Sequence, residues 1–112
     1  MALQKTFLLP DGHSSNYIRF NRVAVMDRTQ RVAVIWFDLF KDAATAATLG
    51  AKPHVADAFR LVAADAAYDA WFSNAALAAA THDIVAQAYA AAKVLPLDWW
   101  NGHAPLADAV DV

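Results

Sequence analysis

The chain has 112 residues, of which 59% are apolar, and its net charge at neutral pH is −2. This length permits one domain that buries about two-thirds of the surface its unfolded chain exposes, and the near-neutral charge excludes a general attraction to nucleic acid. Because no cysteine is present, disulfides, thiolate catalysis and cysteine-bound zinc are also excluded.

Residues 2–40 predict three antiparallel strands joined by short turns. Leucine, threonine and phenylalanine side chains favour a strand over residues 2–9, which a Pro-Asp-Gly turn ends. A second strand follows over residues 16–27, and its apolar side chains change face near Arg22, which indicates a β-bulge. A short polar link leads to the third strand, residues 31–40, and its shortness predicts an antiparallel hairpin.

The third strand raises the main structural question, because both of its faces are apolar. One face would carry Val32, Val34, Trp36 and Phe40, and the other would carry Ala33, Ile35, Phe37 and Leu39. We expect the helix predicted for residues 84–93 to cover one face. We expect the C-terminal tail and a neighbouring subunit to cover the other.

The middle of the chain contains one short predicted helix and one ambiguous segment. Residues 41–50 predict a helix that Asp42 caps and Gly50 ends. Residues 55–72 fit both a helical and a strand period, and their alanines favour a helix. Their aromatic end and aspartates favour a strand, which we predict from about Phe59, with an interruption allowed.

Residues 74–95 predict two helices, and the remaining residues predict a docked tail. Ser73 is a suitable cap for the first helix, and the run 81–83 contains capping residues before the second. The tail, residues 96–112, is aromatic and then apolar, unlike a disordered terminus. The expected fold is therefore α+β: a small antiparallel β-meander of three to four strands packed against one or two C-terminal helices.

The residues that commonly carry chemistry do not form a recognisable motif. A recognisable metal-binding motif places its ligands a few residues apart, and the histidines lie far apart in the sequence at His13, His54, His82 and His103. No serine stands in a nucleophile motif, and the glycines are isolated, so no phosphate-binding loop is expected. Aspartate pairs such as Asp65 and Asp69 are interpreted as solvated or capping residues. We therefore predict no catalytic residue, cofactor or metal.

Large aromatic residues are the best candidates for a functional surface, because interfaces are enriched in them. The predicted packing and interface residues are Trp36, Phe40, Tyr89, Trp99, Trp100 and Val110. A competing interpretation is a small ligand-binding module. In that case the second face of the sheet lines a pocket whose walls are Trp36, Tyr89, Trp99 and Trp100.

Four short stretches carry a resemblance that covers nearly the whole chain. They are Met1-Ala-Leu-Gln-Lys-Thr-Phe7, Tyr17-Ile-Arg19, Ile84-Val-Ala-Gln-Ala-Tyr-Ala-Ala-Ala-Lys-Val-Leu-Pro96 and Leu106-Ala-Asp-Ala-Val-Asp-Val112. With these stretches the chain resembles small structural proteins of tailed bacteriophages and prophages, encoded in or near the tail and baseplate genes. It departs from that pattern in an alanine-rich segment, 41–54, and in a longer tail, 99–105.

The resemblance implies a non-enzymatic virion component, in the tail or baseplate. Its expected partners are other virion proteins or further copies of itself, with no nucleic acid and no membrane. Its expected location is the virion, and the host cytoplasm before assembly.

Overall fold

The computed structural model describes residues 2–9, 11–48, 50–95, 97–99 and 106–112, and the backbone of residues 102–104. These residues form strands and helices in the order β1 (Leu3–Leu8), β2 (Ser14–Asp27), β3 (Val32–Phe40), α1 (Ala43–Ala47), β4 (Val55–Ala64), α2 (Ala66–Trp71), α3 (Asn74–Ala79), α4 (Ile84–Ala92), β5 (Leu97–Trp99), β6 (Gly102–Ala104) and β7 (Val110–Asp111). Within the described part of the chain, no helix is long and apolar enough to cross a membrane.

The strands form one antiparallel sheet with the order β6-β5-β4-β3-β2-β1-β7. The α+β class is therefore confirmed, but the prediction of three to four strands is too low. The additional strands come from residues 97–111, which extend the sheet at both edges. Each of these strands has only two or three residues, which is too short to show a period in the sequence.

The predicted hairpin of β2 and β3 is confirmed, and so is the bulge near Arg22. The two strands pair along nearly their whole length, and the register shifts between Phe20 and Arg22 and again between Val23 and Val25. Each shift inserts an extra residue into β2, so the side chains after it point to the face opposite to the one that simple alternation would give them. Phe20, Val23 and Met26 therefore all pack against the same core.

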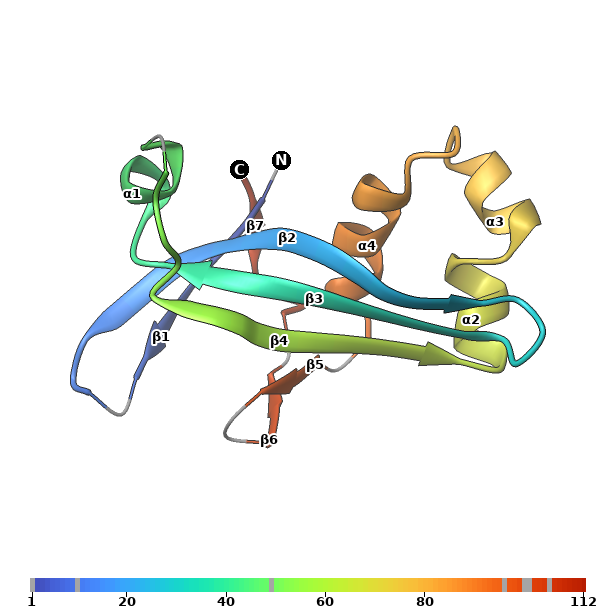
Figure 1. Cartoon of the computed structure of the whole chain (residues 1–112), viewed down its shortest axis with the longest axis horizontal. Helices are drawn as coiled ribbons and strands as arrows, with labels where there is room; N and C mark the ends of the chain where they lie inside the picture. The colour runs from blue at the N-terminus through green and yellow to red at the C-terminus, as the bar shows by residue number, and fades with distance from the viewer. Residues whose placement is uncertain (1, 10, 49, 96, 100–101, 105) are drawn as a thin grey trace.

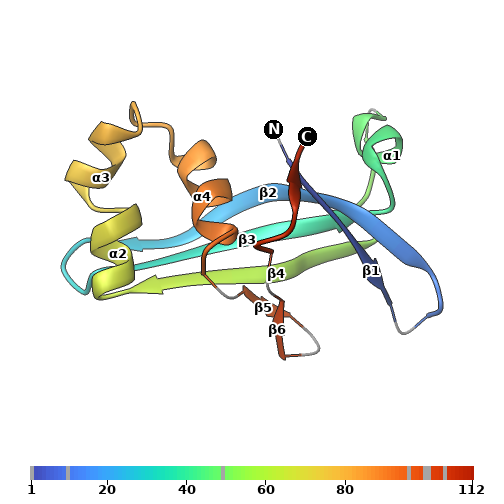
Figure 2. The same ribbon diagram turned by 180° about the vertical axis from the view of Figure 1, so that it is seen from behind.

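Helices α2 and α3 lie near the end of the sheet where the β2–β3 turn lies, α4 lies over the middle of β2 and β3, and α1 lies at the opposite end (Figure 1 and Figure 2). The core combines three groups of buried side chains. Strand β3 contributes Ala33, Ile35, Phe37 and Leu39. Helix α4 contributes Ala88, Ala91 and Ala92, and the tail contributes Leu97, Leu106 and Ala109.

This core corrects the expectation about the two faces of β3. The predicted helix does cover one face, but the tail covers the same face, because Leu97 and Leu106 are fully buried among the helix and sheet residues. The tail reaches this position because it leaves one edge of the sheet at β5 and β6 and joins the other edge at β7. The opposite face, with Val32, Val34 and Trp36, stays half-exposed.

The segment 55–72, which fits both a helical and a strand period, contains one strand and one helix. Residues 55–64 form β4, as the strand prediction requires, whereas residues 66–71 form α2, so a strand reaching residue 72 is wrong. The break occurs at Asp65, whose φ of 53° turns the chain.

The predicted helix caps are confirmed. The side chain of Asp42 accepts a hydrogen bond from the Thr45 amide, and Ser73 and Asp83 cap α3 and α4 in the same way. Helix α1 ends at Ala47, before the predicted stop at Gly50.

Candidate functional site

The face of β2, β3 and β4 that points away from the helices, called here the outer face, carries an apolar band. Val34 pairs with Val25 on one side and with Val62 on the other, and Val32 lies next along β3 on the same face. Val25 and Val62 are 41% and 40% exposed, and the other two valines are half-buried. We call these four residues the valine band. It is a contiguous patch over three adjacent strands, and none of the described elements covers it completely.

Next to the valine band, a row of side chains crosses four strands. Its members pair in register from β2 to β5, in the order Arg22, Trp36, Arg60 and Asp98. The guanidinium carbons of Arg22 and Arg60 lie 5.7 Å and 6.0 Å from the centre of the Trp36 ring. These distances suit cation–π interactions, so the indole is held between two cations.

Aspartates neutralise both of these cations. Arg22 pairs with Asp57 at 2.5 Å, and Arg60 pairs with Asp98 at 2.8 Å. The hydrogen bond and charge of Arg22 hold the pKa of Asp57 below its ordinary value. Asp57 also accepts a hydrogen bond from the Asn21 side chain at 3.0 Å. The row is therefore charged but internally paired.

A shallow hollow of about 230 Å³ opens beside this row, where β3, β4 and β5 meet. Its lining residues are Trp36, Asp57, Ala58, Arg60, Asp98 and Trp99. The ring of Trp99 stacks on Phe59 with centroids 5.8 Å apart and an interplanar angle of 19°, and it meets the edge of Phe7 at 5.0 Å. These contacts fix the orientation of Trp99 in the wall of the hollow.

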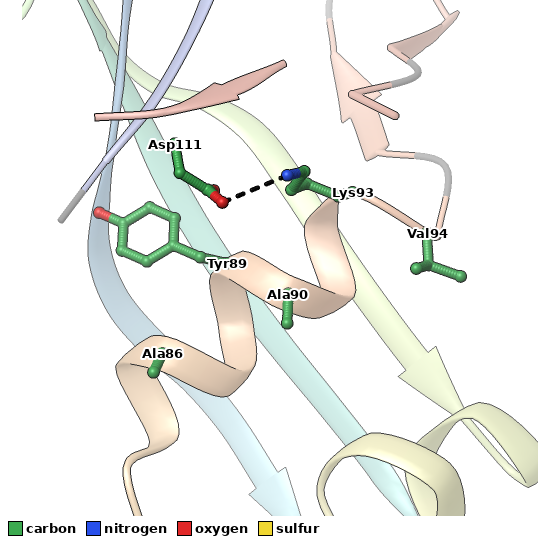
Figure 3. A pocket seen from close by; sticks show the side chains of 6 residues that line it. All are labelled: Ala86, Tyr89, Ala90, Lys93, Val94 and Asp111. Atoms are coloured by element: carbon green, nitrogen blue, oxygen red, sulfur yellow. Dashed lines mark hydrogen bonds and ion pairs between the residues drawn. The ribbon is translucent and has the colours of Figure 1, made fainter. Parts of the chain in front are cut away.

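A second hollow, the α4 groove, lies between α4 and β7 and has a volume of about 460 Å³. Figure 3 shows its lining residues, Ala86, Tyr89, Ala90, Lys93, Val94 and Asp111. Lys93 and Asp111 reach toward each other at 3.4 Å (Figure 3). The hydroxyl of Tyr89 accepts a hydrogen bond from the Phe20 amide at 2.6 Å, and burial raises the pKa of this tyrosine.

The structure also brings together a serine, a histidine and an aspartate that are far apart in the sequence. Ser15 Oγ lies 2.5 Å from His54 Nδ1, and His54 Nε2 lies 2.9 Å from Asp11 Oδ2. The His13 amide and His54 hold the pKa of Asp11 below its ordinary value. This order of groups resembles a catalytic triad, but Ser15 is only 2% exposed, so a substrate cannot reach its hydroxyl. We interpret these hydrogen bonds as structural contacts that hold the 41–54 segment against β2.

A neighbouring cavity of about 240 Å³ is lined by His13, Ser14, Lys41 and His54. Sequence reasoning missed the meeting of His13 and His54, whose ring centres are 6.3 Å apart. Spacing along the chain contained no signal for it. Among the described residues, no group of three or more potential ligands is placed to hold a metal ion.

The structure separates the six predicted packing and interface residues. Trp36 and Trp99 come together at the hollow beside the charged row. Phe40 and Tyr89 are 1% and 3% exposed, so both are core residues of the single chain. Val110 is exposed on β7, at the far edge of the sheet, and Trp100 lies outside the described residues.

Comparisons of the chain with models of protein families, with curated proteins and with solved structures gave no match.

Proposed function

We propose that this chain is a non-enzymatic structural protein of a bacteriophage virion, a tail or baseplate component that acts by assembling with other proteins. The observation that carries the assembly role is the outer face, where the valine band and Trp36 lie half-exposed in a regular three-stranded surface. The resemblance of the sequence to small phage structural proteins supports the location in the virion.

The composition of the outer face fits a protein interface. Interfaces combine an apolar centre with a polar rim, and tryptophan and arginine contribute much of their binding energy. Here the valine band supplies the apolar centre, and the row containing Trp36 and Arg60 supplies the rim. Because the rim charges are already paired, burying them against a neutral partner surface leaves no uncompensated charge. Copies of this chain and other virion proteins are the proposed partners.

Light scattering coupled to size-exclusion chromatography tests the assembly role. We expect the wild-type chain to form a defined oligomer and Val62→Lys to reduce it to a monomer, because a lysine in the valine band places an unpaired charge in the interface. Val94→Lys is the matched control, because Val94 is 65% exposed but lies on the α4 groove. Loss of the oligomer in the control alone would assign assembly to the groove instead.

Mass spectrometry of purified particles tests the location in the virion. We expect the chain among the proteins of the phage that encodes it. A chain that is monomeric at every concentration and missing from purified particles would overturn the proposed function.

A small ligand-binding module is a second candidate function. The observation that favours it is the meeting of Trp36 and Trp99 in the wall of one hollow, although they lie on different strands. A ligand-binding module would be a monomer whose melting temperature rises when its ligand is added, which distinguishes it from the assembly role.

A further inference from the structure

The hollow where β3, β4 and β5 meet combines aromatic walls with paired charges. Trp99 is held in place by Phe59 and Phe7, and Trp36 is held between two guanidinium groups. Both indoles are therefore positioned before any ligand binds, which lowers the entropic cost of binding. An aromatic wall attracts a ligand with an apolar face.

The charges in the hollow argue against an ionic ligand. The guanidinium of Arg60 is paired with Asp98, and the carboxylate of Asp57 is paired with Arg22. A phosphate would approach two carboxylates, and an ammonium group would compete with two arginines that are already bound. The pairing therefore favours a neutral ligand.

Two polar atoms of the lining residues keep hydrogen-bonding capacity. Asp57 accepts its bonds from Asn21 and Arg22 through Oδ1, and its Oδ2 has no partner among the described residues. Arg60 donates to Asp98 through Nε and Nη2, which leaves Nη1 for another acceptor. A purely apolar ligand would cover these groups without replacing their bonds to water, which is unfavourable. The ligand should offer both hydroxyl donors and hydroxyl acceptors.

We propose that this hollow binds a neutral saccharide, with one sugar ring lying against Trp36 and its hydroxyl groups bonded to Asp57 and Arg60. A sugar ring joins an apolar face of C–H groups to neighbouring hydroxyls, so it satisfies both requirements. The volume of about 230 Å³ is below the roughly 300–1,000 Å³ of sites for drug-sized ligands, which limits the occupant to about one ring. The inference rests on the second candidate function, and it competes with assembly through the outer face, because Trp36 and Arg60 line the hollow and also form the rim of the proposed interface.

Nitrogen-15 NMR titration of the full chain tests the proposal. The probes are methyl β-D-glucopyranoside, methyl α-D-galactopyranoside and N-acetyl-D-glucosamine, each added to about 20 mM to detect millimolar dissociation constants. We expect at least one probe to shift the indole N–H signal of Trp36. Glucose 6-phosphate, which is charged, should bind more weakly than the neutral probes.

Variants localise the binding. Trp36→Leu should weaken it about tenfold or more, because it removes an aromatic wall but keeps an apolar side chain. Asp57→Asn, which keeps the shape of the hollow, should weaken it by a smaller factor. Trp71→Leu is the matched control, because this half-buried tryptophan lies on α2, away from the hollow, and its loss should leave binding unchanged.

Two results would overturn the saccharide proposal. One is the absence of a shift with all three neutral probes, and the other is binding that Trp36→Leu and Asp57→Asn leave unchanged. p-Cresol, a non-sugar aromatic probe, separates the two proposals. If it shifts the Trp36 indole signal while no sugar does, the hollow is a ligand site of another class. The second candidate function then survives the failure of the saccharide proposal. The oligomer measured by light scattering reports on assembly separately.

Discussion

The hydrogen bond between Tyr89 and the β2 bulge gives the sharpest test of how the fold is held together. The register of β2 and β3 shifts directly after Phe20, and the amide of Phe20 donates to the Tyr89 hydroxyl at 2.6 Å. Tyr89 itself is 3% exposed. The variant Tyr89→Phe keeps the ring in the core but removes the acceptor, which leaves the part-buried Phe20 amide without this partner.

The expected cost follows from that unsatisfied amide. Leaving a buried donor unpaired destabilises a protein by about 1–3 kcal/mol. For a domain of this size, each kcal/mol lowers the melting temperature by about 4 °C. We therefore expect Tyr89→Phe to lower the free energy of unfolding by about 1–3 kcal/mol in urea denaturation, with an unchanged m-value, and to lower the calorimetric melting temperature by about 4–12 °C.

Tyr68 provides the matched control, because it is also 3% exposed and also lies in the core. Its hydroxyl is buried and has no hydrogen-bond partner among the described residues. Tyr68→Phe removes an unsatisfied group, so it should be neutral or stabilising. If the two variants have the same stability, the hydrogen bond to the bulge does not contribute, and the reasoning is wrong.

Further predictions concern pH, packing and capping. Burial raises the pKa of Tyr89 above its ordinary 10.0, so the folded state binds the phenol proton more tightly than the unfolded state does. The free energy of unfolding should therefore fall as pH rises above about 10, and Tyr89→Phe should reduce that fall. Arg22 lowers the pKa of Asp57, so the contribution of this carboxylate to stability is present above pH 3.8 and is lost as pH falls through its folded pKa. NMR titration of Asp57 should give a midpoint below 3.8, and Arg22→Gln should raise that midpoint. Leu106→Ala should cost about 2–5 kcal/mol in urea denaturation, because Leu106 is 1% exposed in the core. Asp83→Ala should cost about 1 kcal/mol by calorimetry and Asp83→Asn much less, because asparagine also caps helices; equal losses would contradict the cap.

Local physics accounts for the parts of the fold that the sequence predicted well. Helix caps depend on a side chain and an amide three residues later, so Ser73 and Asp83 were recognisable without any tertiary information. The β2–β3 hairpin and its bulge were visible because alternation and its reversal near Arg22 are properties of adjacent residues. The α+β class follows from the same short-range signals.

The tail shows what local signals do not contain. The aromatic and apolar composition of residues 96–112 predicted docking, but the position of the tail depends on contacts with residues far away in the chain. Leu106 enters the core on the face that α4 already covers, and β7 pairs with β1 at the other end of the sequence. No periodicity in a segment of two or three residues reports such a pairing.

The candidate sites were decided by tertiary structure in the same way. The sequence identified Trp36 and Trp99 as important aromatic residues, but only the pairing of β3, β4 and β5 places them around one hollow. His54 meets Ser15 and Asp11 across 39 and 43 positions. The sequence alone showed that strand β3 is apolar on both faces. Only the tertiary structure, in which the helix and the tail pack against the same side, decided that the valine-rich outer face stays accessible. Burial depends on the whole chain and not on one strand, so the sequence of one strand does not determine it.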